Sequence, residues 1–390
     1  MSDLAASMAA HATQLQQAGI RKIHVLAWRD LADPDAGGSE LHADEFSRRW
    51  ADLGFEITHR TSALAGVAAV QDRNGYRVVS RGGRITVFPR VVGSELLRRE
   101  GSFDAVVEVW NGVPWFSPVW TRRPRLTFLH HVHGPMWDQL LPKPFASLGR
   151  LLEARLAPPF YRRGLMLTPS DATRDELIEL GLRPDRVRAI PNGVDPSFSP
   201  AGDKSPHPSV LAVGRLAPVK RFEALIDAAV VARRRVPALQ LHIVGAGPLD
   251  DALRHQVRAL GAGDYVHFLG HVEHSRLVEL YRSAWVVSSA SLAEGWGLSL
   301  TEGAACGTPA VATDIRGHRS SVIAGHTGVL SPVDQLGDAL ADLLLDDERR
   351  LLLGRQAHAR AAKLTWERVA HDMLVALADE SVPGRAQPLT

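Results

Sequence analysis

The most constraining feature of this 390-residue chain is the repeated alternation of short β-branched runs with longer helical patterns. The first run, Lys-Ile-His-Val-Leu-Ala at 22–27, is followed by an amphipathic segment over 40–53. Strands that are separated by helices pair in parallel, with the helices packed on the faces of the sheet. The sequence therefore predicts parallel α/β sheets. Further strands are predicted at 56–59, 85–88, 105–108, 126–130 and 165–168.

The strand and helix pattern restarts in the second half of the chain, beginning with a run at 210–214. Between the two series, the stretch 195–208 is rich in Pro, Ser and Gly and has no apolar period, which is typical of a linker. Further strands of the second series are predicted at 241–244, 266–269, 284–288 and 310–312. The expected organisation is a first domain over 1–195, a linker over 196–208, a second domain over 209–364, a helix over 365–382 and a tail over 383–390.

Composition narrows the class of protein. Hydrophobic residues at 45% and charged residues at 23% are typical of a soluble globular chain. The 45 Lys and Arg against 43 Asp and Glu give a net charge of only +2, so bulk charge predicts no nucleic-acid binding. The single cysteine, Cys306, excludes an intramolecular disulfide, and residues 1–19 resemble neither a signal peptide nor a membrane anchor. We expect a cytoplasmic protein.

Two carboxylates, Glu294 and Glu302, are separated by seven residues in a stretch where a loop becomes a helix. The start of a helix presents unpaired N–H groups that suit a phosphorylated ligand, and a carboxylate accepts hydrogen bonds from sugar hydroxyls. The alternative is that Glu302 only complements the helix dipole and Glu294 is solvated. The other candidate donor-binding residues of this motif are Gly295, Gly297, Leu298 and Ser299.

Two cations, Arg215 and Lys220, lie between the strand at 210–214 and a helical run over 222–235. Open α/β sheets bind ligands at this carboxyl edge. A planar guanidinium and an ammonium can balance the charge that grows on a diphosphate leaving group, without a metal ion. The alternative is a pair of exposed surface cations.

These motifs resemble those of the retaining GT-B glycosyltransferases of family 4, in which two glutamates spaced as E-x7-E follow a Gly-Arg and a Lys. The match departs in one respect, because the four residues 216–219 separate Arg215 from Lys220, one fewer than in the family pattern. The resemblance spans nearly the whole chain. It implies two Rossmann-like parallel-sheet domains facing each other across a cleft, an N-terminal acceptor domain and a C-terminal donor domain, with the last helix crossing back to the first domain.

The resemblance also implies a reaction. A hexose would pass from a nucleoside diphosphate sugar to a hydroxyl of a glycan, lipid or small-molecule acceptor, with the anomeric configuration retained and with no metal or cofactor. Arg215 and Lys220 would stabilise the departing diphosphate, Glu294 would bind donor-sugar hydroxyls, and Glu302 would hold the nucleotide ribose. GDP-mannose, UDP-glucose and UDP-N-acetylglucosamine remain comparable donors.

Several glycines and backbone positions are implied donor contacts. Gly37 and Gly38 follow the first strand and resemble the donor-binding glycine loop of the family, although a plain turn explains them equally well. The resemblance further assigns to the nucleotide cleft Gly214, Gly245, His271 and Val272.

Three histidines, His130, His131 and His133, end the strand predicted at 126–130. A zinc site is disfavoured, because adjacent strand residues point to opposite faces and no Cys or carboxylate cluster accompanies them. In the family, one histidine at the equivalent strand end lies near the reacting sugar. Strand length favours His130, with His131 and His133 as alternates.

The basic stretch 143–163, with four arginines, has two interpretations. It fits a helix on a membrane surface, or an ordinary helix packed on its domain with Glu153 interrupting the basic face. Peripheral membrane contact is therefore a possible further partnership, at the inner face of the membrane. The basic side chains are those of Arg150, Arg155, Arg162 and Arg163.

Other functions fit less well. The glycines at 245–247 are too few for a dinucleotide fingerprint, so NAD binding is disfavoured. A GT-B nucleotide-sugar epimerase would need acid and base carboxylates that are not recognisable here. A non-catalytic nucleotide-sugar-binding protein of the same fold remains an alternative.

Overall fold

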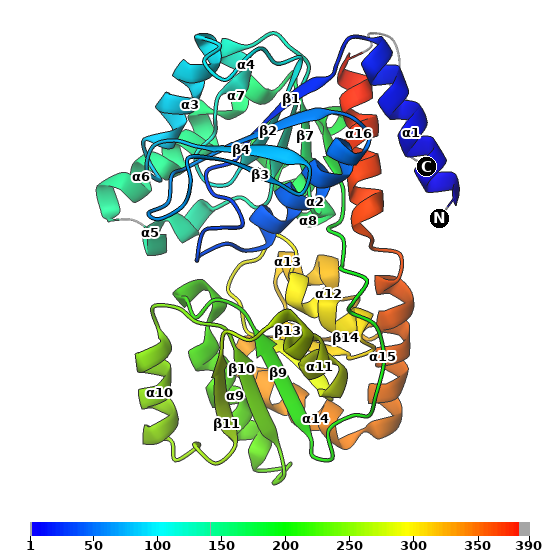
Figure 1. Ribbon diagram of the computed structural model, residues 1–390. Coiled ribbons are helices and arrows are strands. Elements are labelled where there is room, and N and C mark those ends of the chain that lie inside the picture. Colours follow the sequence, from blue (N-terminus) through cyan, green and yellow to red (C-terminus); the bar gives the residue numbers. More distant parts are fainter. Residues whose placement is uncertain (1, 141, 382–390) are drawn as a thin grey trace. The chain divides into compact units, whose positions relative to one another are not determined.

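The computed structural model describes residues 2–140 and 142–381, and the chain forms two compact units (Figure 1). Unit 1 contains the described residues up to Gly193 and those from Trp366 onward, and unit 2 contains Val194–Thr365. The tail expected at 383–390 lies outside the described residues. The two predicted parallel α/β domains are confirmed.

Unit 1 has an eight-stranded sheet in the order β3-β4-β2-β1-β5-β6-β7-β8, parallel throughout except for the β3–β4 pair. Because β2 lies on one side of β1 and β5 on the other, the strand order reverses between β1 and β5. The strands are β1 Lys22–Leu26, β2 Glu56–Thr61, β3 Val70–Arg73, β4 Tyr76–Ser80, β5 Ala105–Trp110, β6 Arg125–Leu129, β7 Leu165–Thr168 and β8 Val187–Ala189. The helices are α1 Ser2–Gln17, α2 Gly38–Asp52, α3 Val87–Leu96, α4 Ser117–Trp120, η1 Gly134–Met136, α5 Trp137–Leu140, α6 Lys143–Leu151, η2 Leu152–Leu156, α7 Pro158–Tyr161, α8 Asp171–Glu179, η3 Pro184–Arg186 and α16 Trp366–Ser381.

The central strand β5 is buried on both faces of the sheet, and all but one of its residues are apolar. Val107 and Val109 of β5 join a large core with α2 and α16, while Val106 packs in a second cluster on the other face. Alternating strand residues point to opposite faces, so a strand that is covered twice must be apolar throughout. Helix α16 contacts α1, α2 and β6, and therefore belongs to unit 1 although it ends the described chain.

Unit 2 has a six-stranded parallel sheet in the order β11-β10-β9-β12-β13-β14, with its reversal between β9 and β12. Leu241 and Ile243 of β10 face one core, and Val244 faces the other. The strands are β9 Ser209–Val213, β10 Gln240–Val244, β11 Val266–Gly270, β12 Val286–Ser289, β13 Ala310–Thr313 and β14 Gly328–Ser331. The helices are η4 Pro218–Lys220, α9 Phe222–Arg233, α10 Asp250–Ala259, α11 His274–Ser283, α12 Leu298–Ala305, α13 Arg316–Ser321, η5 Val333–Gln335, α14 Leu336–Leu345 and α15 Asp347–Ala361.

Two expectations are wrong. The strand predicted at 85–88 is a turn leading into α3, with Ile85 82% exposed, because Val87 and Val91 form a helical apolar stripe. The stretch 196–208, expected to be a linker, packs on unit 2: Phe198 is buried in its core and the Lys204 ammonium donates to the Ala284 carbonyl at 2.9 Å.

The sequence analysis also missed four short strands, β3, β4, β8 and β14, which lie toward the sheet edges. None of the helices among the described residues is both long enough and apolar enough to cross a lipid bilayer.

Candidate active site

The candidate residues of unit 2 gather at the carboxyl edge of its sheet. The loop after β9 carries Arg215 and Lys220, and the loop after β12 carries Glu294. These two strands are neighbours and flank the reversal of strand order. A crevice opens at such a reversal because the loops on its two sides turn in opposite directions, and ligands of open α/β sheets bind there.

Lys220 and Glu294 bond directly across this reversal. The Lys220 ammonium lies 2.5 Å from Glu294 Oε1, which also accepts a hydrogen bond from the Ser291 hydroxyl at 2.8 Å. Burial raises the pKa of Glu294, but Lys220, His318 and these hydrogen bonds lower it, and the net pKa lies below its ordinary value. The carboxylate is therefore charged at neutral pH. Arg215 lies in the same loop as Lys220 and is exposed to solvent.

Close backbone approach requires glycine at one of the predicted positions, Gly245. A Cβ atom on Gly245 would lie 2.0 Å from the Gly214 carbonyl oxygen, and Gly245 has φ +131°. The Gly245 N–H in turn donates to the Gly270 carbonyl at 2.8 Å. The loops after β9, β10 and β11 are thus held together. His271, which follows β11, is exposed, and Val272 is half-buried against the core.

The turn between Glu294 and α12 is held by another glycine. Gly297 is the residue before the helix and has φ +100°, in the left-handed region that favours glycine. Leu298 and Ser299 then open α12, and these two residues and Gly295 are half-buried. The first N–H groups of a helix have no carbonyl partner within the helix, so this turn presents donors at the same edge as Lys220.

Glu302 lies in the second turn of α12 and faces α11. The Tyr281 hydroxyl donates to Glu302 Oε2 at 2.6 Å. Burial raises the pKa of Glu302, while the bond from Tyr281 lowers it, and the net pKa lies above its ordinary value. Glu302 is half-buried, and Tyr281 is the only hydrogen-bond donor to its carboxylate among the described residues, so the carboxylate can accept further hydrogen bonds from a ligand.

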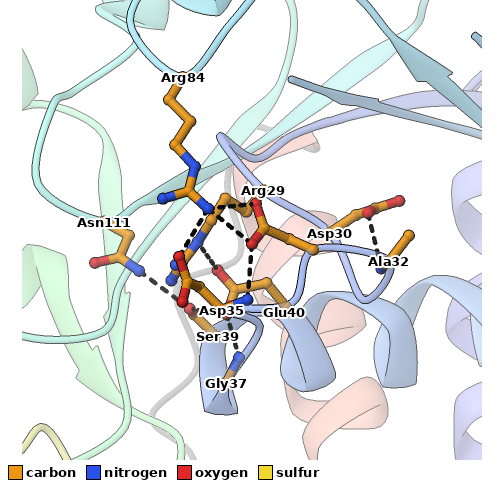
Figure 2. Close-up of polar contacts among 10 residues, drawn as sticks. Arg29, Asp30, Ala32, Asp35, Gly37, Ser39, Glu40, Arg84 and Asn111 are labelled. Carbon is orange, nitrogen blue, oxygen red and sulfur yellow. Dashed lines mark hydrogen bonds and ion pairs between the residues drawn. The ribbon is translucent and has the colours of Figure 1, made fainter. Parts of the chain in front are cut away.

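In unit 1, the glycine loop is held by Glu40 (Figure 2). Gly37 precedes α2 and Gly38 is its first residue. The Gly37 N–H donates to Glu40 Oε2 at 2.8 Å, and the buried Arg29 guanidinium donates to Glu40 Oε1 at 3.2 Å. The two glycines therefore form a fixed turn rather than an open loop.

The same carboxylate links the two strands that flank the reversal in unit 1. Ser39 donates to Glu40 Oε2 at 2.9 Å, and Asn111, which follows β5, donates to the Ser39 hydroxyl at 3.0 Å (Figure 2). Arg84 approaches from the loop after β4 and pairs with Asp33 and Asp35. The carboxyl edge of unit 1 thus carries a connected polar network.

His130 follows β6 directly and is buried. Burial, and then His131, lower the pKa of His130 to about 3, so its ring is neutral at physiological pH. The ring centroid lies 4.8 Å from that of Phe128 and 5.0 Å from that of His42, which is one turn into α2. Its Nε2 atom has no hydrogen-bond partner among the described residues.

His131 and His133 form a separate stack. Their ring centroids are 4.3 Å apart, and His133 also stacks on Trp137 at 4.8 Å. Glu153 accepts hydrogen bonds from the His133 and Gly134 N–H groups, both at 2.9 Å, and from the Trp137 indole at 3.2 Å. Glu153 is 2% exposed and does not interrupt the basic face of the 143–163 stretch, contrary to our expectation.

The structure brings Lys220 and Glu294 into direct contact, and places Gly214 and Gly245 together beside them. Gly37, Gly38 and the histidines belong to unit 1. Sequence reasoning missed the residues that hold the candidates in place: two lie only three residues from their partners, and two reach their partners from another element. These residues are Ser291, Tyr281, Glu40 and, in its true role, Glu153.

Two family models match the chain in succession. Residues 36–198 match the model described as Glycosyltransferase Family 4, and residues 197–360 match the one described as Glycosyl transferases group 1. The two matches meet near the boundary between the units and together cover both sheets. The chain belongs to the GT-B glycosyltransferases of family 4.

Relatives of this glycosyltransferase match from about half to almost the whole of its length. The D-inositol 3-phosphate glycosyltransferase of Kribbella flavida is 29% identical over 93% of this chain and 95% of its own. Its counterpart in Corynebacterium glutamicum is 32% identical over 56% of this chain and 59% of its own.

Solved structures share the fold of this glycosyltransferase. Sucrose-phosphate synthase from Thermosynechococcus elongatus has a TM-score of 0.75 at 21% identity and covers 90% of this chain and 97% of its own. Anabaena HepE, solved in complex with UDP-glucose, has a TM-score of 0.69 at 21% identity and covers 91% and 98%.

Proposed function

We propose that this glycosyltransferase moves a hexose from a nucleoside diphosphate sugar to an acceptor hydroxyl, with retention of the anomeric configuration. The observation that carries the proposal is the Lys220–Glu294 pair at the strand reversal of unit 2. One member suits a phosphate and the other suits sugar hydroxyls. A ligand that has both groups adjacent, as a sugar phosphate ester does, matches the pair.

In the proposed reaction, the acceptor oxygen bonds to the anomeric carbon as the bond from that carbon to the diphosphate oxygen breaks. The acceptor proton passes to an oxygen of the leaving diphosphate, and the sugar is transferred on the face that the diphosphate leaves. Arg215 and Lys220 balance the charge that develops on the diphosphate, so no metal is required. Glu294 orients the sugar ring, and Glu302 binds the ribose.

The comparisons support a nucleotide-sugar donor and leave its base open. Anabaena HepE is described in complex with UDP and UDP-glucose, and the relatives are described as acting on D-inositol 3-phosphate. We carry over the donor class, with uridine and guanosine as the candidate bases. The acceptor is a hydroxyl of a glycan, a lipid or a small molecule such as a cyclitol phosphate.

The test combines a donor panel with two lysine variants. Purified protein is incubated with UDP- and GDP-sugars and candidate acceptors in the presence of EDTA, and the product anomer is assigned by NMR. Lys220→Ala is expected to lower the transfer rate by at least about a hundredfold. Lys363→Ala removes an exposed lysine elsewhere in unit 2 and should change nothing. Inverted product, or full activity in Lys220→Ala, contradicts the proposal.

We also propose that the segment 143–163 of unit 1 binds an anionic lipid surface. Its one acidic side chain, Glu153, is buried, so the exposed charges are all basic. Large apolar side chains at helical spacing accompany them, each between 45% and 60% exposed. Basic and apolar groups on one short helical segment match a lipid headgroup layer. The apolar residues are Phe145, Leu148, Leu151, Leu156 and Phe160.

Vesicle co-sedimentation tests this surface. The protein should bind vesicles that contain phosphatidylglycerol more tightly than neutral phosphatidylcholine vesicles. The double change Phe145→Ser and Leu148→Ser should weaken binding roughly a hundredfold, since it removes two exposed apolar side chains that the lipid surface would bury. Leu351→Ser with Leu352→Ser, which removes two exposed leucines of unit 2, is the matched control. Equal sedimentation of all three proteins would refute the surface.

A further inference from the structure

Tyr281 of α11 is a buried side chain that is fixed at several points. Its backbone carbonyl accepts from the Thr308 hydroxyl at 2.6 Å, and its ring lies edge-on to Phe198 with centroids 5.5 Å apart. The side chain is fully buried. Its hydroxyl therefore has one direction in which to donate, and that direction leads to Glu302 Oε2 at 2.6 Å.

The chemistry of the pair makes Tyr281 the donor. Burial and the Glu302 carboxylate raise the pKa of Tyr281 well above its ordinary value, so the hydroxyl keeps its proton. An ionised carboxylate accepts hydrogen bonds at both oxygens and donates none. Among the described residues, no hydrogen bond reaches Glu302 Oε1, which is left as an acceptor with a fixed orientation.

We infer that Tyr281 is the positioning residue of Glu302, holding one carboxylate oxygen so that the carboxylate faces the ribose hydroxyls of the donor nucleotide. The inference rests on the proposed function, in which Glu302 binds the ribose. It adds a residue that does not touch the ligand and acts only through Glu302. A rigid acceptor loses less conformational entropy on binding than one that must first be ordered.

The experiment measures how strongly the protein prefers ribose over deoxyribose. Binding of UDP and GDP, and of their 2′-deoxy counterparts, is measured by calorimetry. The unaltered protein should bind the better ribonucleotide about tenfold more tightly than its deoxy form, the effect of one hydrogen bond to a charged group. In Tyr281→Phe this ratio should fall to about threefold or less, with deoxynucleotide affinity nearly unchanged.

If Tyr281 had only a structural role, Tyr281→Phe would lower the affinity for the ribonucleotide and for the deoxynucleotide by the same factor. Glu302→Gln provides the second arm: in that background, adding Tyr281→Phe should leave the ribose preference unchanged, because the effect passes through the carboxylate. Tyr76→Phe is the matched control, since it removes a tyrosine–carboxylate bond of the same 2.6 Å length in unit 1.

The pH profile gives a further readout. Loss of the Tyr281 bond raises the pKa of Glu302, so donor binding by Tyr281→Phe should fail at a higher pH than in the unaltered protein. A folded Tyr281→Phe protein that keeps its full ribose preference overturns the inference alone. If the unaltered protein binds the ribonucleotide and its 2′-deoxy form equally well, Glu302 does not bind the ribose, and the inference about Tyr281 fails with that role.

Discussion

Lys220 and Glu294 each satisfy the other's charge, which makes the effect of removing one of them predictable. Glu294→Gln should lower the free energy of unfolding by about 1 to 3 kcal/mol, since a hydrogen bond between charged groups is lost. The transfer rate should fall about a hundredfold. Urea unfolding and initial-rate assays measure the two effects, with the exposed Glu273→Gln as the control.

The stability part of this effect has a defined pH dependence. The folded state holds the pKa of Glu294 below its ordinary 4.5, so its contribution is fully present above that pH and is lost as the pH falls toward the folded pKa. The stability difference between the unaltered protein and Glu294→Gln should therefore shrink on acidification below pH 4.5. A difference that grows in acid would contradict the assigned ionisation.

Glu153 allows a second test at the residue scale. Glu153→Gln keeps the size of the side chain but loses the charge that receives three N–H groups. We expect unit 1 to lose about 1 to 3 kcal/mol of stability, because a buried carboxylate that is fully hydrogen-bonded becomes a poorer acceptor. Glu56→Gln, at an exposed carboxylate of the same unit, should be neutral in the same thermal melts.

The sequence identifies residues with distinctive local spacing and misses those that act across the fold. Glu294 and Glu302 stand seven residues apart in a loop that becomes a helix, a pattern visible without coordinates. Glu153 reaches His133 only because two short helices fold back, and Tyr281 reaches Glu302 from another helix. Such partners are set by tertiary packing, and a single sequence carries no periodic signal for them.

At the scale of elements, the contact between the loops after β9 and β10 leaves no room for a side chain. Gly245→Ala would place a methyl group 2.0 Å from the Gly214 carbonyl oxygen, so one loop must move. We expect a loss of stability of about 1 to 3 kcal/mol and weaker nucleotide binding. Gly263→Ala has open space around its Cβ atom and serves as the control in the same calorimetric and melting experiments.

Helices and strands were predicted well where the residues fitted only one kind of element, and poorly where a short run fitted both a strand and a helix. Strand β7 lies where it was expected, because Leu165–Thr168 is buried at every position and its first three residues are apolar. The run at 85–88 also has three large apolar residues and a threonine, but Val87 and Val91 bury one helical stripe while Ile85 stays exposed. A stretch of four residues is too short to separate the period of a strand from that of a helix.

At the scale of the whole molecule, the two units should respond differently to acid. Burial is the main cause that lowers the pKa of three buried histidines of unit 1: of His59 to about 4, of His130 to about 3, and of His42 well below its ordinary value. Below pH 6.5 the unfolded chain binds protons that these folded groups do not, so stability falls with pH. His59 alone contributes a loss of roughly 3 kcal/mol by pH 4.

Burial also lowers the pKa of two histidines of unit 2, His242 and His318. Since unit 1 has three such groups against two, unit 1 should unfold before unit 2 between pH 6.5 and 4. Pulse-labelled hydrogen exchange read by mass spectrometry assigns protection to each unit. His59→Phe should shift the acid midpoint of unit 1 to lower pH, whereas His255→Phe, at an exposed histidine of unit 2, should not. Simultaneous loss of protection in both units, or earlier loss in unit 2, would contradict this order.

The division into two α/β units was predictable because the strand and helix pattern runs twice in succession. The boundary between the units was not predictable. A stretch rich in Pro, Ser and Gly lacks regular structure both in a linker exposed to solvent and in a segment that packs on a domain. Phe198 and Lys204 decide the matter by burying a ring and an ammonium against unit 2.

The Lys220–Glu294 bond has a consequence for selectivity in a cell that is rich in phosphate. The Lys220 ammonium already pairs with Glu294, so a free inorganic anion that binds this lysine gains little and leaves the Glu294 carboxylate without its cationic partner. On the proposed function, a nucleotide sugar would bring a phosphate for Lys220 and hydroxyls for Glu294. It would replace the Lys220–Glu294 contact with one contact to each residue. On the proposed function, the resting protein would therefore select ligands that carry a phosphate and sugar hydroxyls together.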